Sequence, residues 1–387
     1  MNDIQWSMLL AGRVSRTIAA TTVEVEDTVK HAQSIASVRD LCSLGLSSEL
    51  FVPALLEALH GVIPSSRNLF DWIDTHGHIE RYYFEGSIDS KIARLYFDEF
   101  YNRREAEAMP RFSDLARGDT VIRGAQELNR NSFFDSALYN EIWRPQNLHY
   151  HLEAIIRGAD HKALGSLVLY RERTDPVFVA DEENLLATLT PYIARAMQLG
   201  TKRAEQFAVA GARRGALVNL DQLGHILYLS PNAHNILLLA HGNITPSAAR
   251  TEPNADDFPT LAVLCRSLAR SPGAQAPVAL TLDNDWGRFE FQAQRMEPAD
   301  AQRTPMIAVT IQHAEATEVL KARALQSAPL SVVQKKVCSL LLCGRSQREI
   351  AAELGVMPNT VVDHVRKIYR KLDAHSIDDL RTKLLQG

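Results

Sequence analysis

Polar side chains that suit contact with nucleic acid gather near the end of the chain, after Pro358. A buried helical stripe is predicted there by apolar residues at steps of four, three and four, namely Val361, Val365, Ile368 and Leu372. The outer face is left to Asn359, Thr360, Asp363, His364, Arg366, Lys367, Arg370 and Lys371. Arginine and lysine neutralise phosphates, while Asn, Asp, His and Arg side chains can hydrogen-bond base edges. The pattern therefore predicts a helix whose outer face contacts DNA.

Capping boxes predict the short helices that must position this face. In the first box, Ser331 accepts a hydrogen bond from the third backbone N–H of a helix, and Gln334 reaches back to the backbone N–H of Ser331. We expect this helix to run to about Cys343. Gly344 then ends it, because glycine adopts the left-handed conformation that a helix exit often needs.

A second box, Ser346 with Glu349, begins a second helix, which Gly355 ends. Pro358 begins the third helix, since its ring fixes φ near about −65°. Ser376 caps a last helix. Two short helices joined by a tight turn, the second with a cationic outer face, form helix-turn-helix geometry.

Charge is distributed unevenly along the chain. Residues 330–387 hold ten Lys/Arg and six Asp/Glu, a net charge of +4. Since the whole chain carries −4, the 329 residues before them carry −8. A basic terminal domain on an acidic body is expected when only that domain meets phosphates.

Residues 330–385 resemble, without a gap, the DNA-binding domain of LuxR-type transcription regulators. Like residues stand at Leu330-Ser331, Gly344, Glu349-Ile350-Ala351, Leu354-Gly355-Val356, Thr360-Val361, His364 and Arg370-Lys371-Leu372. The resemblance implies a bacterial, sequence-specific regulator of transcription that binds double-stranded DNA. It also implies that the last helix pairs two domains, so we expect a homodimer on an inverted-repeat promoter site with half-sites roughly 10 bp apart. RNA polymerase is a further candidate partner.

Side-chain chemistry separates two roles on the outer face. Thr360, Lys367 and Arg370 are candidates for phosphate contacts. The candidates for base edges are Asn359, Asp363, His364 and Arg366. The alternative for each of these side chains is a solvated helix face.

The chain departs from the family pattern at three positions. Gln334 stands where Glu is usual and keeps the cap without the charge. Val362 replaces a usual Lys, which removes one phosphate contact. Met357 replaces a common Ser cap, and the loss should weaken the start of the third helix by roughly 1 kcal/mol.

The first half of the chain has the pattern of a helix, an antiparallel sheet and a long exit helix. A helical pattern over 47–59 is followed by strand patterns over 68–74, 78–84, 149–157 and 163–170. This order resembles a GAF domain. The segment 139–148, YNEIWRPQNL, is similar to one that precedes the last strands of such domains in LuxR-type regulators.

The exit helix begins near Asp181 and has apolar residues three and four apart, Leu186, Leu189, Ile193, Ala196 and Gly200. This seam would pair with a second copy of the chain or pack on its own sheet, and the sequence favours neither. Pro191 is expected to kink the helix.

A second sheet pattern follows a short Ala/Gly/Arg stretch over 209–215. A strand over 216–220, a turn over 221–224, a strand over 225–229 and a helix start over 230–233 resemble the opening of a PAS domain. Strands over 277–282, 287–294 and 306–312 would complete its sheet, with polar loops at 250–258 and 299–304. A connecting helix is expected over 314–327.

The predicted fold class is α+β, with GAF-like and PAS-like antiparallel-sheet sensor domains before an all-α four-helix LuxR-type domain. The predicted segments are an N-terminal helical segment over 1–46, a GAF-like domain with exit helix over 47–205, a PAS-like domain over 212–315, a linker helix over 316–329 and the DNA-binding domain over 330–387.

Two sensor-like domains imply control by a small-molecule effector. Aromatic and histidine side chains of the first domain are the candidates to line its site, namely Phe70, Trp72, Tyr82, Phe133, Tyr139, Trp143 and His149, together with Tyr83, Phe134 and His151. Such residues are also explained as plain core. The sequence identifies neither the effector nor a cofactor. The alternative is that these domains only dimerise or bind a protein partner.

Other classes of function find little support in the sequence. It contains no G-x-x-x-x-G-K-[ST], H-E-x-x-H or G-x-S-x-G motif, so we expect no enzyme. His225 and His234 are candidate haem ligands, and the alternative for each is a structural role. The four cysteines form no metal-binding motif. Without a signal peptide or an apolar run long enough to span a membrane, we expect a cytoplasmic protein with no membrane contact.

Overall fold

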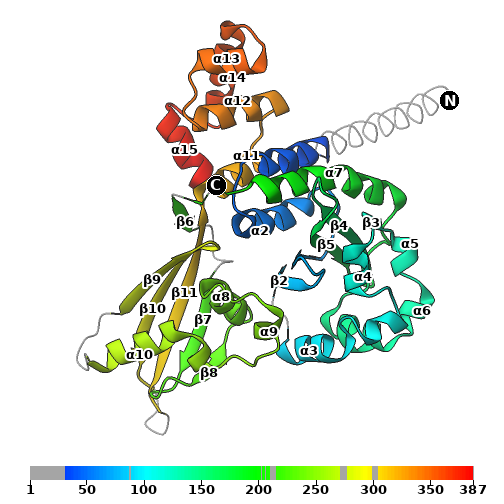
Figure 1. Cartoon of the computed structure of the whole chain (residues 1–387). Coiled ribbons are helices and arrows are strands. Elements are labelled where there is room, and N and C mark those ends of the chain that lie inside the picture. The colour runs from blue at the N-terminus through cyan, green and yellow to red at the C-terminus, as the bar shows by residue number, and fades with distance from the viewer. Residues whose placement is uncertain are drawn as a thin grey trace, which may run out of the picture. The chain divides into compact units, whose positions relative to one another are not determined.

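The structure is a computed structural model that describes residues 31–86, 89–201, 203–204, 206–209, 215–270, 277–298 and 304–386. Of the predicted N-terminal segment 1–46, residues 1–30 lie outside the described residues, and 31–42 are helical. Most of the predicted connection 209–215 and loop 299–304 also lies outside them. One compact unit spans Leu41–Lys321, and residues 322–387 belong to another (Figure 1).

The first domain is built on a five-stranded antiparallel sheet in the order β2-β1-β5-β4-β3. The strands are β1 (Arg67–Ile73), β2 (Ile79–Phe84), β3 (Ile122–Arg123), β4 (Tyr150–Arg157) and β5 (Ala163–Arg171). β1 and β5 are paired although about ninety residues separate them along the chain, with Asp71 opposite Ser166 and Leu69 opposite Val168. This long-range pairing brings residues of β1, β4 and β5 onto one face.

Helices α2 (Ser48–Leu59) and α7 (Ala180–Leu199) pack beside this sheet, α2 against β1 and α7 against β4. In α7 the side chains of Leu186, Leu189 and Ile193 are fully buried. Of the two explanations for this apolar seam, packing on the domain's own sheet is therefore the one that the structure supports.

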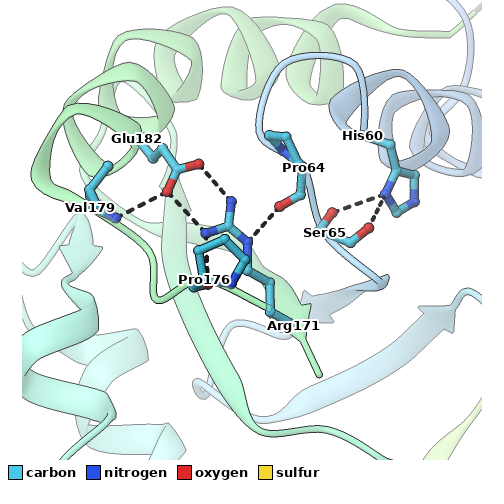
Figure 2. A network of polar contacts seen from close by, with 7 residues as sticks. All are labelled: His60, Pro64, Ser65, Arg171, Pro176, Val179 and Glu182. Atoms are coloured by element: carbon cyan, nitrogen blue, oxygen red, sulfur yellow. Dashed lines mark hydrogen bonds and ion pairs between the residues drawn. The ribbon is translucent and has the colours of Figure 1, made fainter. Parts of the chain in front are cut away.

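The amino end of α7 is tied to β5 by one buried arginine (Figure 2). Arg171 donates to the carbonyl oxygens of Pro64 and Pro176, at 2.7 and 3.1 Å, and to the Glu182 carboxylate at 2.6 Å. The same carboxylate accepts from the backbone N–H of Val179 at 3.0 Å, at the residue that precedes the helix. Charge-assisted hydrogen bonds of this kind fix the orientation of the groups that they join.

Short helical segments connect β2 to β4 and contribute to the other side of the sheet. They include α3 (Ser90–Leu95), a π-helical turn (Tyr96–Phe100), α4 (Phe112–Arg117), α5 (Ala125–Leu128), α6 (Asn131–Phe134) and a second π-helical turn (Tyr139–Trp143). The sequence did not predict them, because four to six residues are too few to display a helical period.

The second domain has a sheet in the order β8-β7-β11-β10-β9, with β6 also pairing with β11. The strands are β6 (Phe207–Val209), β7 (Gly215–Leu220), β8 (Ile226–Leu229), β9 (Val278–Asn284), β10 (Gly287–Met296) and β11 (Met306–Ala316). The helices of this domain are α8 (Ala233–Ala240), α9 (Pro246–Ala249) and α10 (Pro259–Arg270). The connecting helix begins later than predicted, because β11 continues to Ala316 and α11 spans Thr317–Ser327.

The C-terminal domain is all-helical. Its helices are α12 (Val332–Leu342), α13 (Gln347–Leu354), α14 (Pro358–Lys371) and α15 (Ile377–Gln386). The predicted fold class, two antiparallel-sheet domains followed by a four-helix domain, is confirmed. Within the described ranges, no helix combines the length and the apolar character that crossing a membrane requires.

Candidate DNA-binding face and ligand cavity

Both predicted capping boxes are present in the C-terminal domain. Ser331 Oγ accepts from the backbone N–H of Gln334 at 3.3 Å, and Gln334 Oε1 accepts from the backbone N–H of Ser331 at 3.1 Å. Ser346 and Glu349 make the same reciprocal pair, at 3.3 and 2.7 Å. Each pair satisfies two backbone groups that a helix start leaves open.

The turn before α14 is formed without such a cap. Gly355 ends α13 in the left-handed conformation, with φ of 65°. Met357 then occupies the N-cap position of α14 and makes no side-chain hydrogen bond to it. Pro358 lies in the first turn of the helix, as predicted.

The apolar stripe of α14 anchors this helix on the domain core. Val361 and Ile368 are fully buried and Val365 is 6% exposed. They belong to one core cluster with Val337 of α12 and Ile350 of α13. Because the stripe is buried, the opposite face of α14 is held outward.

The predicted DNA-contacting residues lie on this outward face. Asn359, Thr360, Asp363, Arg366, Lys367 and Arg370 are exposed, and His364 is half-buried. Lys371, by contrast, donates to the carbonyl oxygen of Pro329 and to Gln334 Oε1, each at 3.0 Å. Lys371 therefore holds the domain together, whereas the seven predicted DNA-contacting residues share a surface that suits phosphate and base contacts.

A cavity of about 130 Å³ lies in the first domain, over the face of the sheet that carries the short helical segments. Its apolar and aromatic lining is Leu69, Ile79, Tyr82, Phe84, Ile92, Ala93, Tyr96, Phe97, Met109, Phe112, Leu115, Ile142, Trp143, Leu148, Val168 and Tyr170. Its polar lining is Asp71, Glu105, Gln146, His151 and Glu153.

Tyr82 and Trp143 are the members of the seven predicted ligand residues that line this cavity. Phe70 and Trp72 flank Asp71 on β1, so they face the other side of the sheet, where Trp72 donates to Ser48 Oγ at 3.1 Å. Phe133 packs behind the lining, with its ring centre 5.4 Å from that of Trp143.

Tyr139 and His149 lie together at a shallow surface groove that Phe134 and Arg173 also line. The Tyr139 hydroxyl and His149 Nδ1 are 2.6 Å apart, and His149 stacks on Phe134 with ring centres 4.3 Å apart. The two histidines considered for haem lie in the second domain. His225 is paired with Asp221 at 2.8 Å, and His234 is near Phe258.

The buried carboxyl groups of the cavity were missed from the sequence. Glu153 accepts from Arg123 Nη1 and from Ser166 Oγ, each at 2.8 Å. Asp71, only 6% exposed, has no side-chain hydrogen bond or ion pair within the described part of the chain. The signal that would have found them is a lone carboxylate between apolar neighbours of a strand, as in Phe70-Asp71-Trp72 and Leu152-Glu153-Ala154.

Burial sets the protonation of these groups. It raises the pKa of the Asp71 carboxyl well above its usual range, and the charge of Glu153 adds to the effect. Burial also lowers the pKa of His151 to about 3, with a smaller contribution from Arg123. His151 is therefore neutral, and neither of its ring nitrogens has a hydrogen-bond partner among the described residues.

Comparisons with known proteins identify the C-terminal domain. Residues 328–383 match the family described as bacterial regulatory proteins, luxR family. A comparison with curated proteins found no match.

Several solved structures share a distant likeness with the chain. The Vibrio cholerae VqmA dimer without target DNA is 18% identical over 45% of this chain and 83% of that chain, with a TM-score of 0.19. The E. coli DhaR(N)–DhaL complex is 14% identical over 74% and 90%, with a TM-score of 0.23. A far-red cyanobacteriochrome photoreceptor is 13% identical over 50% and 100%, with a TM-score of 0.22. The capped helices, the outward face of α14 and the family match together make residues 328–383 a LuxR-type helix-turn-helix DNA-binding domain.

Proposed function

We propose that the chain is a sequence-specific transcription regulator whose DNA binding is controlled by a small molecule in the cavity of the first domain. The observation that carries the proposal is a mostly apolar cavity with unpartnered buried polar groups in a chain that carries a DNA-binding domain. Buried polar groups without partners cost free energy, and a ligand that pairs with them would recover it. Such a cavity is the usual form of a small-molecule site.

On DNA, we assign phosphate contacts to Thr360, Lys367 and Arg370. Base contacts are assigned to Asn359, Asp363, His364 and Arg366. Two copies of the chain would place two such helices in successive major grooves, on half-sites roughly 10 bp apart. DNA binding of this kind belongs to a cytoplasmic protein.

The route from cavity to exit helix is short in this chain. Tyr170 lines the cavity, and Arg171, the next residue on β5, holds the start of α7 through Glu182. A ligand that displaces Tyr170 would move the arginine that orients α7. We infer that α7 passes the state of the cavity toward the rest of the chain.

The DNA assignment is tested with operators selected from a random DNA library by the full-length protein. Arg366→Ala should relax sequence preference at one position per half-site. Lys367→Ala should weaken all sequences alike and reduce the slope of log affinity against log salt by about one. Lys336→Ala, at an exposed lysine of α12, is the matched control. Equal effects of Arg366→Ala and Lys367→Ala on every sequence would exclude the base contact.

The sensing assignment is tested by native mass spectrometry and DNA binding of the same protein. Val168→Phe places a ring in the cavity, and Val177→Phe makes the same change at an exposed valine outside it. We expect bound small-molecule mass in the wild type and in Val177→Phe, its loss in Val168→Phe, and a changed DNA affinity in that variant alone. If Val168→Phe does not change DNA affinity, the alternative is supported, in which the N-terminal domains only dimerise or bind a protein partner.

A further inference from the structure

Among the described residues that line the cavity, the groups that can carry a full charge are carboxyl groups, since His151 is neutral. Asp71, Glu105 and Glu153 line the cavity, and no lysine or arginine does so. The Arg123 side chain, which is only 1% exposed, lies beside Glu153 and balances the charge of that one carboxylate. An anionic ligand would meet these carboxyl groups with no free cation to balance it.

Two of the three carboxyl groups already have partners. Glu153 is held by Arg123 and Ser166, as described above. Glu105 Oε1 accepts from the backbone N–H groups of Phe112 and Asn102, at 2.7 and 2.8 Å. Within the described residues, the Asp71 carboxyl is left without a hydrogen bond or ion pair. A ligand would therefore gain most binding free energy by forming a hydrogen bond or ion pair with Asp71.

The walls around Asp71 favour a positive charge. Tyr82 lies directly opposite Asp71 in the β1–β2 pairing and also lines the cavity. Further lining rings are Phe84, Tyr96, Phe97, Phe112, Trp143 and Tyr170. The faces of aromatic rings carry partial negative charge and attract cations, most strongly where water is excluded. His151 is neutral and so adds no repulsion.

The volume limits the size of the ligand. An engineered protein cavity of about 150 Å³ holds one benzene molecule. At about 130 Å³, this cavity holds a ligand of about the size of a single ring.

We propose that the cavity binds a small organic ammonium ion, whose charged nitrogen hydrogen-bonds Asp71 and whose apolar body lies against the aromatic walls. The inference rests on the proposed function, since it names the class of ligand for the same cavity. The ammonium group supplies the donors that Asp71 lacks, and Asp71 binds it in the ionised form.

The test compares three probes of nearly equal shape, benzylamine, benzyl alcohol and benzoate, with the full-length protein. Thermal unfolding and calorimetric titration are measured with each probe at up to about 10 mM, where a ligand that binds the folded state shifts the unfolding temperature. The variant is Asp71→Asn. The control is Asp135→Asn, the same change at an exposed aspartate outside the cavity lining.

We expect benzylamine to bind most tightly and Asp71→Asn to weaken it by roughly 10- to 100-fold, as for loss of a charged hydrogen bond. Asp135→Asn should behave as the wild type. Because Asp71 buries a carboxyl with no partner, Asp71→Asn without ligand should unfold at the same or a higher temperature, so weaker binding would not reflect misfolding.

Two results would overturn the inference. Benzyl alcohol or benzoate binding as tightly as benzylamine, with binding lost in Val168→Phe, would keep a ligand site but exclude the ammonium class. Failure of all three probes to bind the wild type would also exclude it. The proposed function itself would fail only if Val168→Phe also left DNA binding unchanged.

Discussion

Loss of Arg123 should destabilise the first domain strongly. The side chains of Arg123 and Glu153 are 1% and 6% exposed, and their atoms lie 2.8 Å apart. Arg123→Met keeps much of the volume but leaves the Glu153 carboxylate buried with Ser166 as its remaining partner. Removing one partner of a buried ion pair costs about 3–5 kcal/mol. We therefore expect Arg123→Met to lower the free energy of unfolding by that amount at neutral pH.

The cost should come from the buried charge rather than from lost packing. Without the guanidinium, the Glu153 carboxylate would be buried with no counter-charge, and an unpaired buried charge costs free energy. Urea unfolding of the full-length protein, followed by tryptophan fluorescence, measures it, since Trp143 lines the same cavity.

Two further variants make this prediction specific. Arg123→Met combined with Glu153→Leu removes both charges and should recover most of the loss, because an uncharged pair has no desolvation penalty. Arg104→Met removes an exposed arginine whose ion pair with Glu99 is 41% and 53% exposed, and should cost less than about 1 kcal/mol. A cost for Arg123→Met equal to that of Arg104→Met, or no recovery of stability in the double variant, would refute the reasoning.

Other predictions concern helix caps and one histidine. Met357→Ser should stabilise the C-terminal domain by roughly 1 kcal/mol, because α14 lacks a side-chain cap; an unchanged unfolding temperature would contradict this. Ser346→Ala should cost about 1 kcal/mol by removing half of a capping box, as judged by thermal unfolding against Ser339→Ala, which lies outside the capping boxes. The hydrogen bond from His60 to Glu85 raises the pKa of His60 above its usual 6.5, so this pair stabilises the fold below about pH 6.5 and the gain is lost as pH rises through the folded pKa. His60→Gln should therefore make the unfolding temperature depend less on pH between about pH 5.5 and 8. A pH profile identical to that of the wild type would exclude a stabilising role of this pair.

The C-terminal domain was predictable because local residues determine it. A capping box needs only residues three apart, and both boxes form as predicted. The stripe of α14 was also given by spacing alone, with Val361 and Ile368 buried. Family resemblance added the function but was not needed to place these helix ends.

The cavity was less predictable because long-range pairing determines it. Asp71 meets the cavity through the pairing of β1 with β5, which no local spacing reveals. β1 is buried on both faces, so Phe70, Asp71 and Trp72 show no alternation that would separate the cavity side from the helix side. Selecting aromatic residues by type therefore placed Phe70 and Trp72 among the candidates, although they lie on the opposite face.

The size of the ligand does not prevent it from controlling DNA binding. A ligand shifts a two-state equilibrium only by the difference between its affinities for the two states. A hydrogen bond between an ammonium group and the Asp71 carboxylate is worth about 1.5–3 kcal/mol, so making it in one state alone would change DNA affinity by roughly 10- to 100-fold. This matches the usual strength of coupling between sites. One contact in the cavity would thus suffice, provided that β5 differs between the two states, and the link from Tyr170 through Arg171 to Glu182 makes α7 sensitive to that difference.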